Sequence, residues 1–353
     1  HIQGGAEDFP LQYFFDVREA IKRIRLENTH LEESELFDLR RSLQTINDIV
    51  RYLNRAEDKG EDVDPAPLYP ALYRLTQDVA TYPQLVQGID QILDKFGHIR
   101  DNASPELLNI RRELARAESS VSKTLYSILR SAQSEGLVDK DVTPTLRDGR
   151  LVIPVMPGMK RKISGIVHDE SATGKTVFIE PSEVVEANNR IRELESEERH
   201  EIIRILTTFT NKVRPHSRDI LESYSFLATI DFIRAKAELA KLTKAIEPEI
   251  TDKPHVDWIQ SRHPLLQLSL EKQGKKVVPL DIILNKDKHI LIISGPNAGG
   301  KSVCLKTVGL LQYMVQCGLS IPVGDRSTVG IFDNVMIDIG DEQSLENDLS
   351  TYS

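Results

Sequence analysis

Apolar residues in the first part of the chain recur every three or four positions, which is the spacing of an amphipathic helix. Polar, proline-containing stretches at 59–67 and around Tyr82 interrupt this pattern and predict several helices in place of one. We therefore expect the first part of a helical core in residues 1–110. The clearest helical face contains Leu36, Leu39, Leu43, Ile46, Val50 and Leu53.

A longer helix is predicted to start at Ser104, a good N-cap residue, with Pro105 at its first position. It continues to Gly136 with a narrow apolar seam, the pattern of one partner in an antiparallel coiled coil. The seam consists of Leu107, Ile110, Leu114, Ala117, Val121, Leu125 and Ile128.

The composition changes at Thr143, where β-rich runs at 150–155, 162–167 and 176–179 alternate with Pro and Gly. The stretch 171–175 suits a hairpin turn between the last two runs. A helix resumes at Ser182. Its highly charged part at 192–201 predicts an exposed segment with ion pairs between residues four apart.

One helix goes out, a small β structure follows, and a second helix returns. We therefore expect an arm at 111–204, with a β cap at about 143–183, and the return of the helical core at 205–250.

The strongest chemical signal lies in the last quarter of the chain. Residues 295–302 match the phosphate-binding pattern G-x-x-x-x-G-K-[ST] without a mismatch. The apolar run 289–294 before them suits a buried parallel strand, and 303–316 after them suits a helix. Strand, glycine-rich loop and helix in this order predict a site for a nucleoside triphosphate.

Each residue type in this loop has a chemical reason. Glycines let backbone N–H groups point toward a phosphate, and the following helix N-terminus adds partial positive charge. We expect Lys301 to reach the terminal phosphates as a catalytic group and the Ser302 hydroxyl to bind Mg²⁺. The expected nucleotide contacts are Gly295, Pro296, Asn297, Ala298, Gly299, Gly300, Lys301, Ser302 and Val303.

Composition narrows the remaining possibilities. The net charge of −9 excludes a uniformly basic surface for nucleic acid, so such contact requires a local patch. Cys304 and Cys317 lie thirteen positions apart on the predicted helix, too far to form a disulfide. Without a disulfide framework or an apolar run of about 18 residues, we expect a cytoplasmic protein without a membrane partner.

One basic cluster lies in the expected β cap. Lys160, Arg161 and Lys162 are consecutive, and Lys175 follows in the hairpin turn. They could contact nucleic-acid phosphates, or they could form a solvated surface balanced by interspersed acidic residues. Both interpretations stay open on the residues alone.

Two further positions are ambiguous. Asp338 follows the apolar run 335–337 and could be a second magnesium ligand, although Gly340 and the polar residues after it suggest a loop. His263 precedes Pro264 and could contact a nucleotide base or could be a structural turn residue.

Four segments together resemble successive motifs of the MutS ATPase domain. They are 261–266, 277–281, the phosphate-binding loop and 338–353. The cap sequence 165–181 and the stretch 338–344 are similar to the second bacterial branch, MutS II, and the resemblance covers essentially the whole chain. It implies a mixed α and α/β fold. A helical core would carry a long antiparallel helical clamp arm with a small β cap, followed at 251–353 by the N-terminal part of an ABC-type P-loop ATPase domain.

The resemblance also implies roles for single residues. The ligands would be ATP and Mg²⁺. In a homodimer Ser350 would act in trans on the γ-phosphate bound by the partner, whereas on the residues alone it could simply cap a helix. Val277 occupies the position where mismatch-repair members place an adenine-stacking aromatic residue, so only apolar contact is expected there.

The same resemblance makes 338–353 a loop and signature segment and puts the hydrolytic Glu after Ser353. Because the sequence starts at His1, we expect it to be part of a longer protein, which in this branch lacks the mismatch-reading domains and carries a C-terminal Smr-type nuclease domain.

Three functions are compatible with the sequence. An ATP-dependent clamp could hold branched or duplex DNA and act in repair or in restraining recombination. The same ATPase could bind rRNA and split stalled or collided ribosomes, which the resemblance also implies. A scaffold arm that holds another factor without touching nucleic acid is the third.

Overall fold

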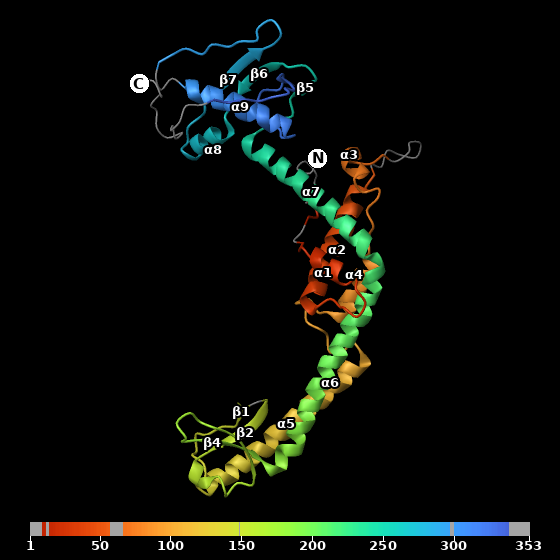
Figure 1. Ribbon diagram of the computed structural model, residues 1–353, viewed down its shortest axis with the longest axis vertical. Coiled ribbons are helices and arrows are strands. Elements are labelled where there is room, and N and C mark those ends of the chain that lie inside the picture. Colours follow the sequence, from red (N-terminus) through yellow and green to blue (C-terminus); the bar gives the residue numbers. More distant parts are fainter. Residues whose placement is uncertain (1–8, 12–13, 57–65, 148, 297–299, 339–353) are drawn as a thin grey trace. The chain divides into compact units, whose positions relative to one another are not determined.

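The computed structural model describes residues 9–11, 14–56, 66–147, 149–296 and 300–338. The chain divides into two compact units, Pro10–Phe226 and a second formed by Leu227–Ser353 with His1–Phe9. Helix α7, Ser217–Thr243, carries the chain from the first unit to the second (Figure 1). Helices and two four-stranded sheets make this a mixed α and β protein.

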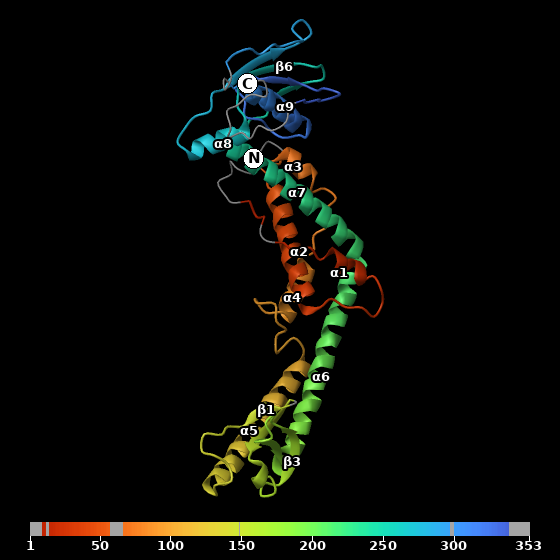
Figure 2. The ribbon, with the colours of Figure 1, turned by 60° about the vertical axis from the view of Figure 1, so that its left-hand side comes forward.

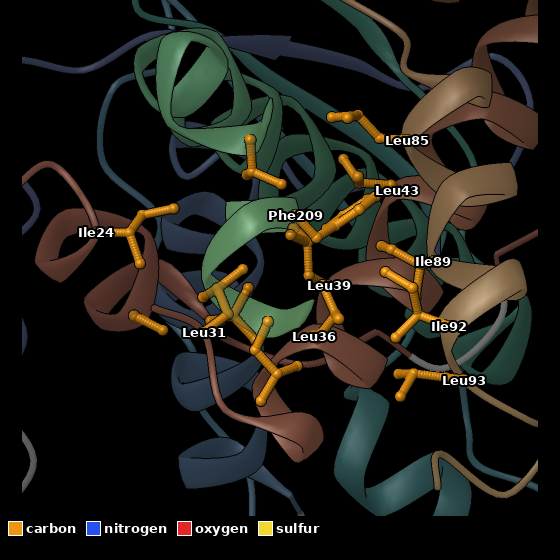
Figure 3. Packing of buried hydrophobic residues seen from close by; sticks show 14 of the residues in the cluster. Ile24, Leu31, Leu36, Leu39, Leu43, Leu85, Ile89, Ile92, Leu93 and Phe209 are labelled. Atoms are coloured by element: carbon orange, nitrogen blue, oxygen red, sulfur yellow. The ribbon is translucent and has the colours of Figure 1, made fainter. Parts of the chain in front are cut away.

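The core of the first unit is helical, as the sequence predicts. It contains α1 (Arg18–Arg23), α2 (Glu33–Leu53), α4 (Pro83–Ile92) and the end of α6 (Ser182–Val213), and the short α3 (Pro70–Arg74) lies between α2 and α4 in the chain. Figure 3 shows side chains from α2, α4 and α6 pointing toward one another. All six residues of the predicted α2 face are buried, so the apolar period identified the core side of this helix correctly.

Helices α5 (Pro105–Ser134) and α6 run side by side in opposite directions, as Figures 1 and 2 show. The predicted N-cap is present, because the Ser104 Oγ accepts a hydrogen bond from the Leu107 N–H at 3.0 Å. Apolar contact continues along the pair, with Val121 and Leu125 of α5 in one cluster with Ile191 of α6. The predicted long helix and the helix that resumes at Ser182 are both confirmed.

The charged part of α6 differs from the expected pattern of pairs four residues apart. Arg190 forms ion pairs with Glu193, three positions on, and with Glu113 of α5, both at 3.2 Å. Glu198 accepts from Arg111 of α5 at 2.7 Å. The expectation considered α6 alone, whereas the neighbouring helix brings its own charges within reach of the same side chains.

A small antiparallel sheet occupies the region predicted to be β-rich. It contains β1 (Thr145–Arg147), β2 (Arg150–Val155), β3 (Gly165–Glu170) and β4 (Val177–Pro181) in the order β1-β2-β4-β3. The predicted hairpin turn is present, with the Ser171 N–H donating to the Thr176 carbonyl at 2.8 Å. Strand β3 begins later than expected, because the Lys162 N–H closes a turn onto Met159 O at 3.0 Å.

The second unit contains a separate sheet, β5-β8-β6-β7. Its strands are β5 (Glu249–Thr251), β6 (Val256–Ser261), β7 (Leu280–Leu284) and β8 (Thr328–Gly330). Among the pairings of the described residues, β5 with β8 is parallel and the other two are antiparallel. Helix α9 (Lys301–Gln316) packs on this sheet, with Leu311 and Met314 in one apolar cluster with Trp258. Helix α8 (Pro264–Lys272) lies between β6 and β7 in the chain.

The expected buried strand at 289–294 is wrong for the described residues. These positions have no regular secondary structure, and the side chains of Ile290 and Ile292 are 75% and 86% exposed. An apolar run becomes a strand only when a neighbouring strand supplies hydrogen bonds. The sheet of this unit is built from β5, β6, β7 and β8, and none of its described ladders includes 289–294.

The proposed division into core, arm and ATPase part, at 110, 204 and 250, stays a prediction.

No helix in the described part of the chain is both long and apolar enough to cross a membrane.

Candidate nucleotide-binding site

The start of α9 has the local structure of an anion-binding helix N-terminus. Gly300 is its N-cap residue, with φ +82° and ψ 8°, and the helix begins at Lys301. A Cβ at Gly300 would meet no atom within 4 Å, so this position requires glycine for its backbone conformation and not for space. The first N–H groups of a helix have no acceptor within it and attract negative charge.

The Lys301 side chain folds back over the loop that precedes its helix. Its Nζ donates to the carbonyl oxygens of Gly295 and Pro296, both at 2.7 Å. These contacts hold the ammonium beside the helix N-terminus, where it adds full charge to the partial charge of the N–H groups. Ser302 is exposed in the first turn, and Val303 is half-buried.

A cavity of about 510 Å³ opens beside Lys301. Its walls come from the β6–α8 junction, the segment before β7 and the first two turns of α9, and its size is typical of small-molecule sites. The cavity brings His263 and Val277, the two candidate base contacts, together with Lys301. The lining residues are Ser261, His263, Leu266, Leu270, Lys276, Val277, Val278, Pro279, Leu280, Ile293, Ser294, Gly300, Lys301, Val303, Cys304 and Thr307.

His263 has the structural role that the sequence left open, and its contact with a base stays a prediction. Its Nδ1 accepts from the Leu266 N–H at 3.4 Å and caps α8, and the same buried ring lines the cavity. Burial, and then the nearby charge of Lys306, hold the pKa of His263 below its ordinary 6.5. The ring is therefore neutral near pH 7, and because Nδ1 accepts, Nε2 carries the proton.

The wall around Val277 is apolar. Val277 is half-buried, and Leu266, Leu270 and Ile293 line the same space. No Phe, Tyr or Trp is among the described residues that line this cavity. A planar base could make apolar contact there without aromatic stacking, as expected from Val277.

Sequence reasoning did not include two residues of α9 that line the cavity. Cys304 and Thr307 lie three and six positions after Lys301 on α9. Their helical spacing could have indicated that they share a face with Lys301. Burial raises the pKa of the Cys304 thiol, which keeps it protonated at neutral pH. The Thr307 hydroxyl donates to the Val303 carbonyl at 2.6 Å.

The donors in this site suit a magnesium-bound triphosphate. An ammonium and a helix N-terminus bind phosphate, and a first-turn hydroxyl such as Ser302 can bind the metal. Asp338 is exposed and lies outside regular structure, and the described residues hold no cluster of three or more His, Cys, Asp or Glu suited to a metal. The expected contacts Asn297, Ala298, Gly299 and Ser350 lie outside the described residues.

Comparison with known proteins matches this loop to a family. Residues 291–353 match the family model for MutS domain V. Proteins called Endonuclease MutS2 from Geobacillus sp. (strain WCH70) and Enterococcus faecalis are 39% and 38% identical over 98% and 100% of this chain. The corresponding protein of Lacticaseibacillus paracasei is 40% identical over 100% of it.

This chain belongs to the MutS family. The chain spans 42% of the length of each of these three relatives. The match to domain V includes Lys301, Ser302 and the first turn of α9, so the cavity beside Lys301 lies partly in the matched segment.

Outside the MutS domain V match, the β1–β4 sheet carries the predicted basic cluster. Lys160, Arg161, Lys162 and Lys175 are all exposed, and within the described part of the chain none of them forms an ion pair with a carboxylate. Ile166 and Val167 on β3 are also exposed, at 49% and 45%. These are features of a surface available for contact.

Two other arginines of this sheet have structural roles. The Arg150 Nη1 donates to Glu180 at 2.7 Å, and Arg147 lies over the Phe178 ring at 4.2 Å. Glu180 is fully buried and also accepts from Asn188 and pairs with His168. This network links β2, β3, β4 and α6, so Arg150 is committed to packing inside the sheet.

Proposed function

We propose that this chain binds ATP and Mg²⁺ at the start of α9 and forms part of an ATP-hydrolysing, DNA-binding clamp of the MutS family. The observation that carries the proposal is the cavity beside Lys301, because it joins a helix start suited to phosphate to an apolar wall. Phosphates would lie against Gly300 and Lys301, and the base against Val277. The Nε2–H of His263 is a donor for a polar atom of the ligand.

The chemistry needed from the protein is mainly positioning. ATP with Mg²⁺ supplies a reactive phosphoanhydride whose charge the metal partly neutralises. Lys301 would exchange its bonds to the Gly295 and Pro296 carbonyls for bonds to phosphate oxygens, and Ser302 would hold the metal. We propose that hydrolysis also needs an acidic residue after Ser353.

Lys301→Ala tests the nucleotide site. Charge-assisted hydrogen bonds contribute about 1.5–3 kcal/mol each, so the variant should bind ATP about tenfold to a hundredfold more weakly and lose hydrolysis. Calorimetric titration with Mg²⁺ and ATP measures the first effect, and phosphate release measures the second. Lys272→Ala, an exposed lysine in the last turn of α8, is the matched control and should behave as the unmodified protein. Equal ATP affinity of the two variants would rule out this site.

We propose that α5, α6 and the β1–β4 sheet form a clamp arm that touches nucleic acid through Lys160, Arg161, Lys162 and Lys175. Their exposure and lack of ion pairs in the described residues support contact over a charge-balanced surface. DNA is the proposed partner, for repair or for restraint of recombination. Ribosomal RNA is the alternative, and a protein-holding scaffold is the third possibility.

Affinity purification from cell lysate, with and without nuclease, separates the three partners. Recovery of DNA that disappears with deoxyribonuclease supports the clamp, whereas recovery of ribosomal subunits supports the alternative. A variant with Gln at positions 160–162 should lose the nucleic-acid partner. Retention of a protein partner after nuclease, by this variant as well, would identify a scaffold.

A homodimer with two shared nucleotide sites completes the proposal. Ser350 would act in trans on the γ-phosphate at its partner's site, so ATP would hold the pair together and control closure of the two arms. Light scattering of Ser350→Ala with ATP and Mg²⁺ tests this role. Unchanged dimerisation and hydrolysis would show that Ser350 does not act across the interface.

A further inference from the structure

A second cavity of about 720 Å³ lies in the helical core of the first unit, between α2 and the segment that follows α4. We propose that it binds one nucleotide unit of a nucleic-acid single strand, with the base stacked on Phe96 and the phosphate held by neighbouring cations. The proposal does not rest on ATP binding at Lys301 or on the basic cluster of the β1–β4 sheet.

Phe96 is an exposed aromatic residue on a rigid turn. Its side chain is 69% exposed, although its backbone N–H donates to Asp94 Oδ1 at 2.8 Å. The His98 N–H donates to the same oxygen at 2.9 Å, and the Gly97 N–H closes the turn onto the Asp94 carbonyl. The backbone of this turn is therefore well hydrogen-bonded, and the exposure of the Phe96 ring does not come from local fraying of the chain.

The turn is also anchored to the helical core. Gly97 has φ +92°, and a Cβ there would lie 2.9 Å from the Phe37 ring of α2. Leu93 and Ile99 on either side of the turn form an antiparallel bridge, and both are buried. Stacking on Phe96 would therefore require little ordering of the protein, which favours binding.

The cavity that Phe96 lines also has cations in its wall, together with the carboxylates of Asp90 and Asp94. Arg41, Lys95 and Arg100 line the cavity, and in the described part of the chain no carboxylate forms an ion pair with any of them. The fourth cation, Arg40, is neutralised by a two-point ion pair with Asp90, at 2.8 and 3.1 Å.

The three cations are held in defined positions. Arg100 Nε donates to the carbonyls of Asp90 and Leu93, which leaves its terminal amino groups for another acceptor. The Arg41 guanidinium lies 4.3 Å from the Phe15 ring centroid, and the Lys95 ammonium lies 4.8 Å from that of Phe96. Half-buried Asp38 interacts electrostatically with Arg41, and burial raises the pKa of its carboxyl.

An exposed ring with flanking cations matches the chemistry of a nucleotide. Bases stack on aromatic side chains regardless of sequence, and Lys and Arg bind the phosphates on either side. An unpaired nucleotide fits because a base inside a duplex cannot offer its face to Phe96. The ligand class is therefore a phosphorylated nucleoside, either within a strand or free.

The decisive measurement is fluorescence anisotropy with a short labelled oligothymidylate, using the full-length protein and Phe96→Ala. Loss of one base stack should weaken binding about tenfold. An abasic oligomer keeps the phosphates but has no bases, so Phe96→Ala should not change its affinity. Lys95→Gln should reduce the slope of log affinity against log salt by about 0.7, the value for one phosphate contact on a single strand.

The chain contains a matched control pair. Phe232 is 61% exposed, and Lys236 lies 4.8 Å from its ring centroid, the same distance as in the Lys95–Phe96 pair. Phe232→Ala and Lys236→Gln should leave oligothymidylate binding unchanged. Competition with thymidine monophosphate separates the two sources of ligand. If the monophosphate displaces the labelled oligothymidylate at an equal concentration of nucleotides, the site binds a free nucleotide. If it does not, the site binds a strand.

Three results would overturn the inference. The first is an unchanged affinity of Phe96→Ala for oligothymidylate. The second is a loss of that affinity in Phe232→Ala as large as in Phe96→Ala. The third is that Phe96→Ala weakens binding of the abasic oligomer as much as binding of oligothymidylate. Circular dichroism of each variant checks that the helical core is intact. Because Phe96 is exposed, its replacement should leave the fold unchanged.

Discussion

The guanidinium of Arg150 on β2 donates to the fully buried carboxylate of Glu180 on β4 at 2.7 Å. The same carboxylate accepts from Asn188 on α6 at 2.7 Å and pairs with His168 on β3. One acidic side chain therefore connects three strands to the long helix. It adds a polar link to the apolar packing that already joins β2 and β4 to the helix pair.

Glu180→Gln should destabilise the first unit by about 3 kcal/mol, because breaking a buried ion pair leaves its partner uncompensated. Gln keeps the size of the side chain, so the loss reports charge and hydrogen bonding. Urea denaturation measures it. Glu170→Gln, on the exposed side of β3, is the control and should stay within about 0.5 kcal/mol of the unmodified protein.

The same carboxylate should contribute to acid sensitivity. Burial alone would raise the pKa of Glu180, but hydrogen bonds from Asn188, His168 and Arg150 bring it below its ordinary 4.5. The unfolded chain therefore binds the proton first. The stabilisation is complete above pH 4.5 and is lost as the pH falls through the lower folded pKa. The stability difference between the unmodified protein and Glu180→Gln should shrink over this range, and a constant difference would contradict the assignment.

His263→Asn should change the pH dependence of the second unit. Because burial lowers the pKa of His263, its stabilising contribution is complete above 6.5 and declines as the pH falls below that value. Asn can still cap α8 but does not titrate. Thermal melts from pH 8 to pH 5 should therefore show a flatter profile for the variant. Lys306→Gln should raise the pKa of His263, which proton NMR of the ring can follow.

Gly300→Ala should cost about 1–2 kcal/mol, because the left-handed backbone there is unfavourable for a residue with a Cβ. The new Cβ has no close neighbour, so the cost is conformational and not steric. We expect weaker ATP binding together with lower stability. Gly158→Ala, also in open space but without a left-handed φ, should cost nothing. Equal ATP affinity and equal stability of the two variants would show that the loop does not need a residue with left-handed backbone at position 300.

Ser104→Ala should lower stability by about 1–2 kcal/mol through loss of the α5 cap. The Ser104 hydroxyl also donates to buried Glu201, so its removal leaves that carboxylate with one fewer donor. Ser104→Asn has both a donor and an acceptor and should recover most of the loss. Guanidinium denaturation of the two variants measures the difference, and equal losses would argue against the cap.

The sequence by itself determined the elements that depend on local chemistry. Ser104 and Pro105 start α5, the apolar period of α2 identifies its buried face, and the turn at 171–175 joins β3 to β4. Each depends on residues a few positions apart, through caps, helical spacing or turn geometry. The G-x-x-x-x-G-K-[ST] motif is local in the same sense, because one loop and one helix start supply most phosphate contacts.

Tertiary structure decided which distant residues meet. His263 and Val277 come together with Lys301 because β6, β7 and α9 pack in one unit, and no local pattern sets that arrangement. Arg150 is held by Glu180 from a neighbouring strand, a pairing that the sequence does not reveal. The apolar run 289–294 is not a strand, because strand formation depends on a hydrogen-bonded partner and not on composition alone. Local spacing specifies helices and turns, whereas pairing, burial and cavities depend on contacts between segments far apart in the chain.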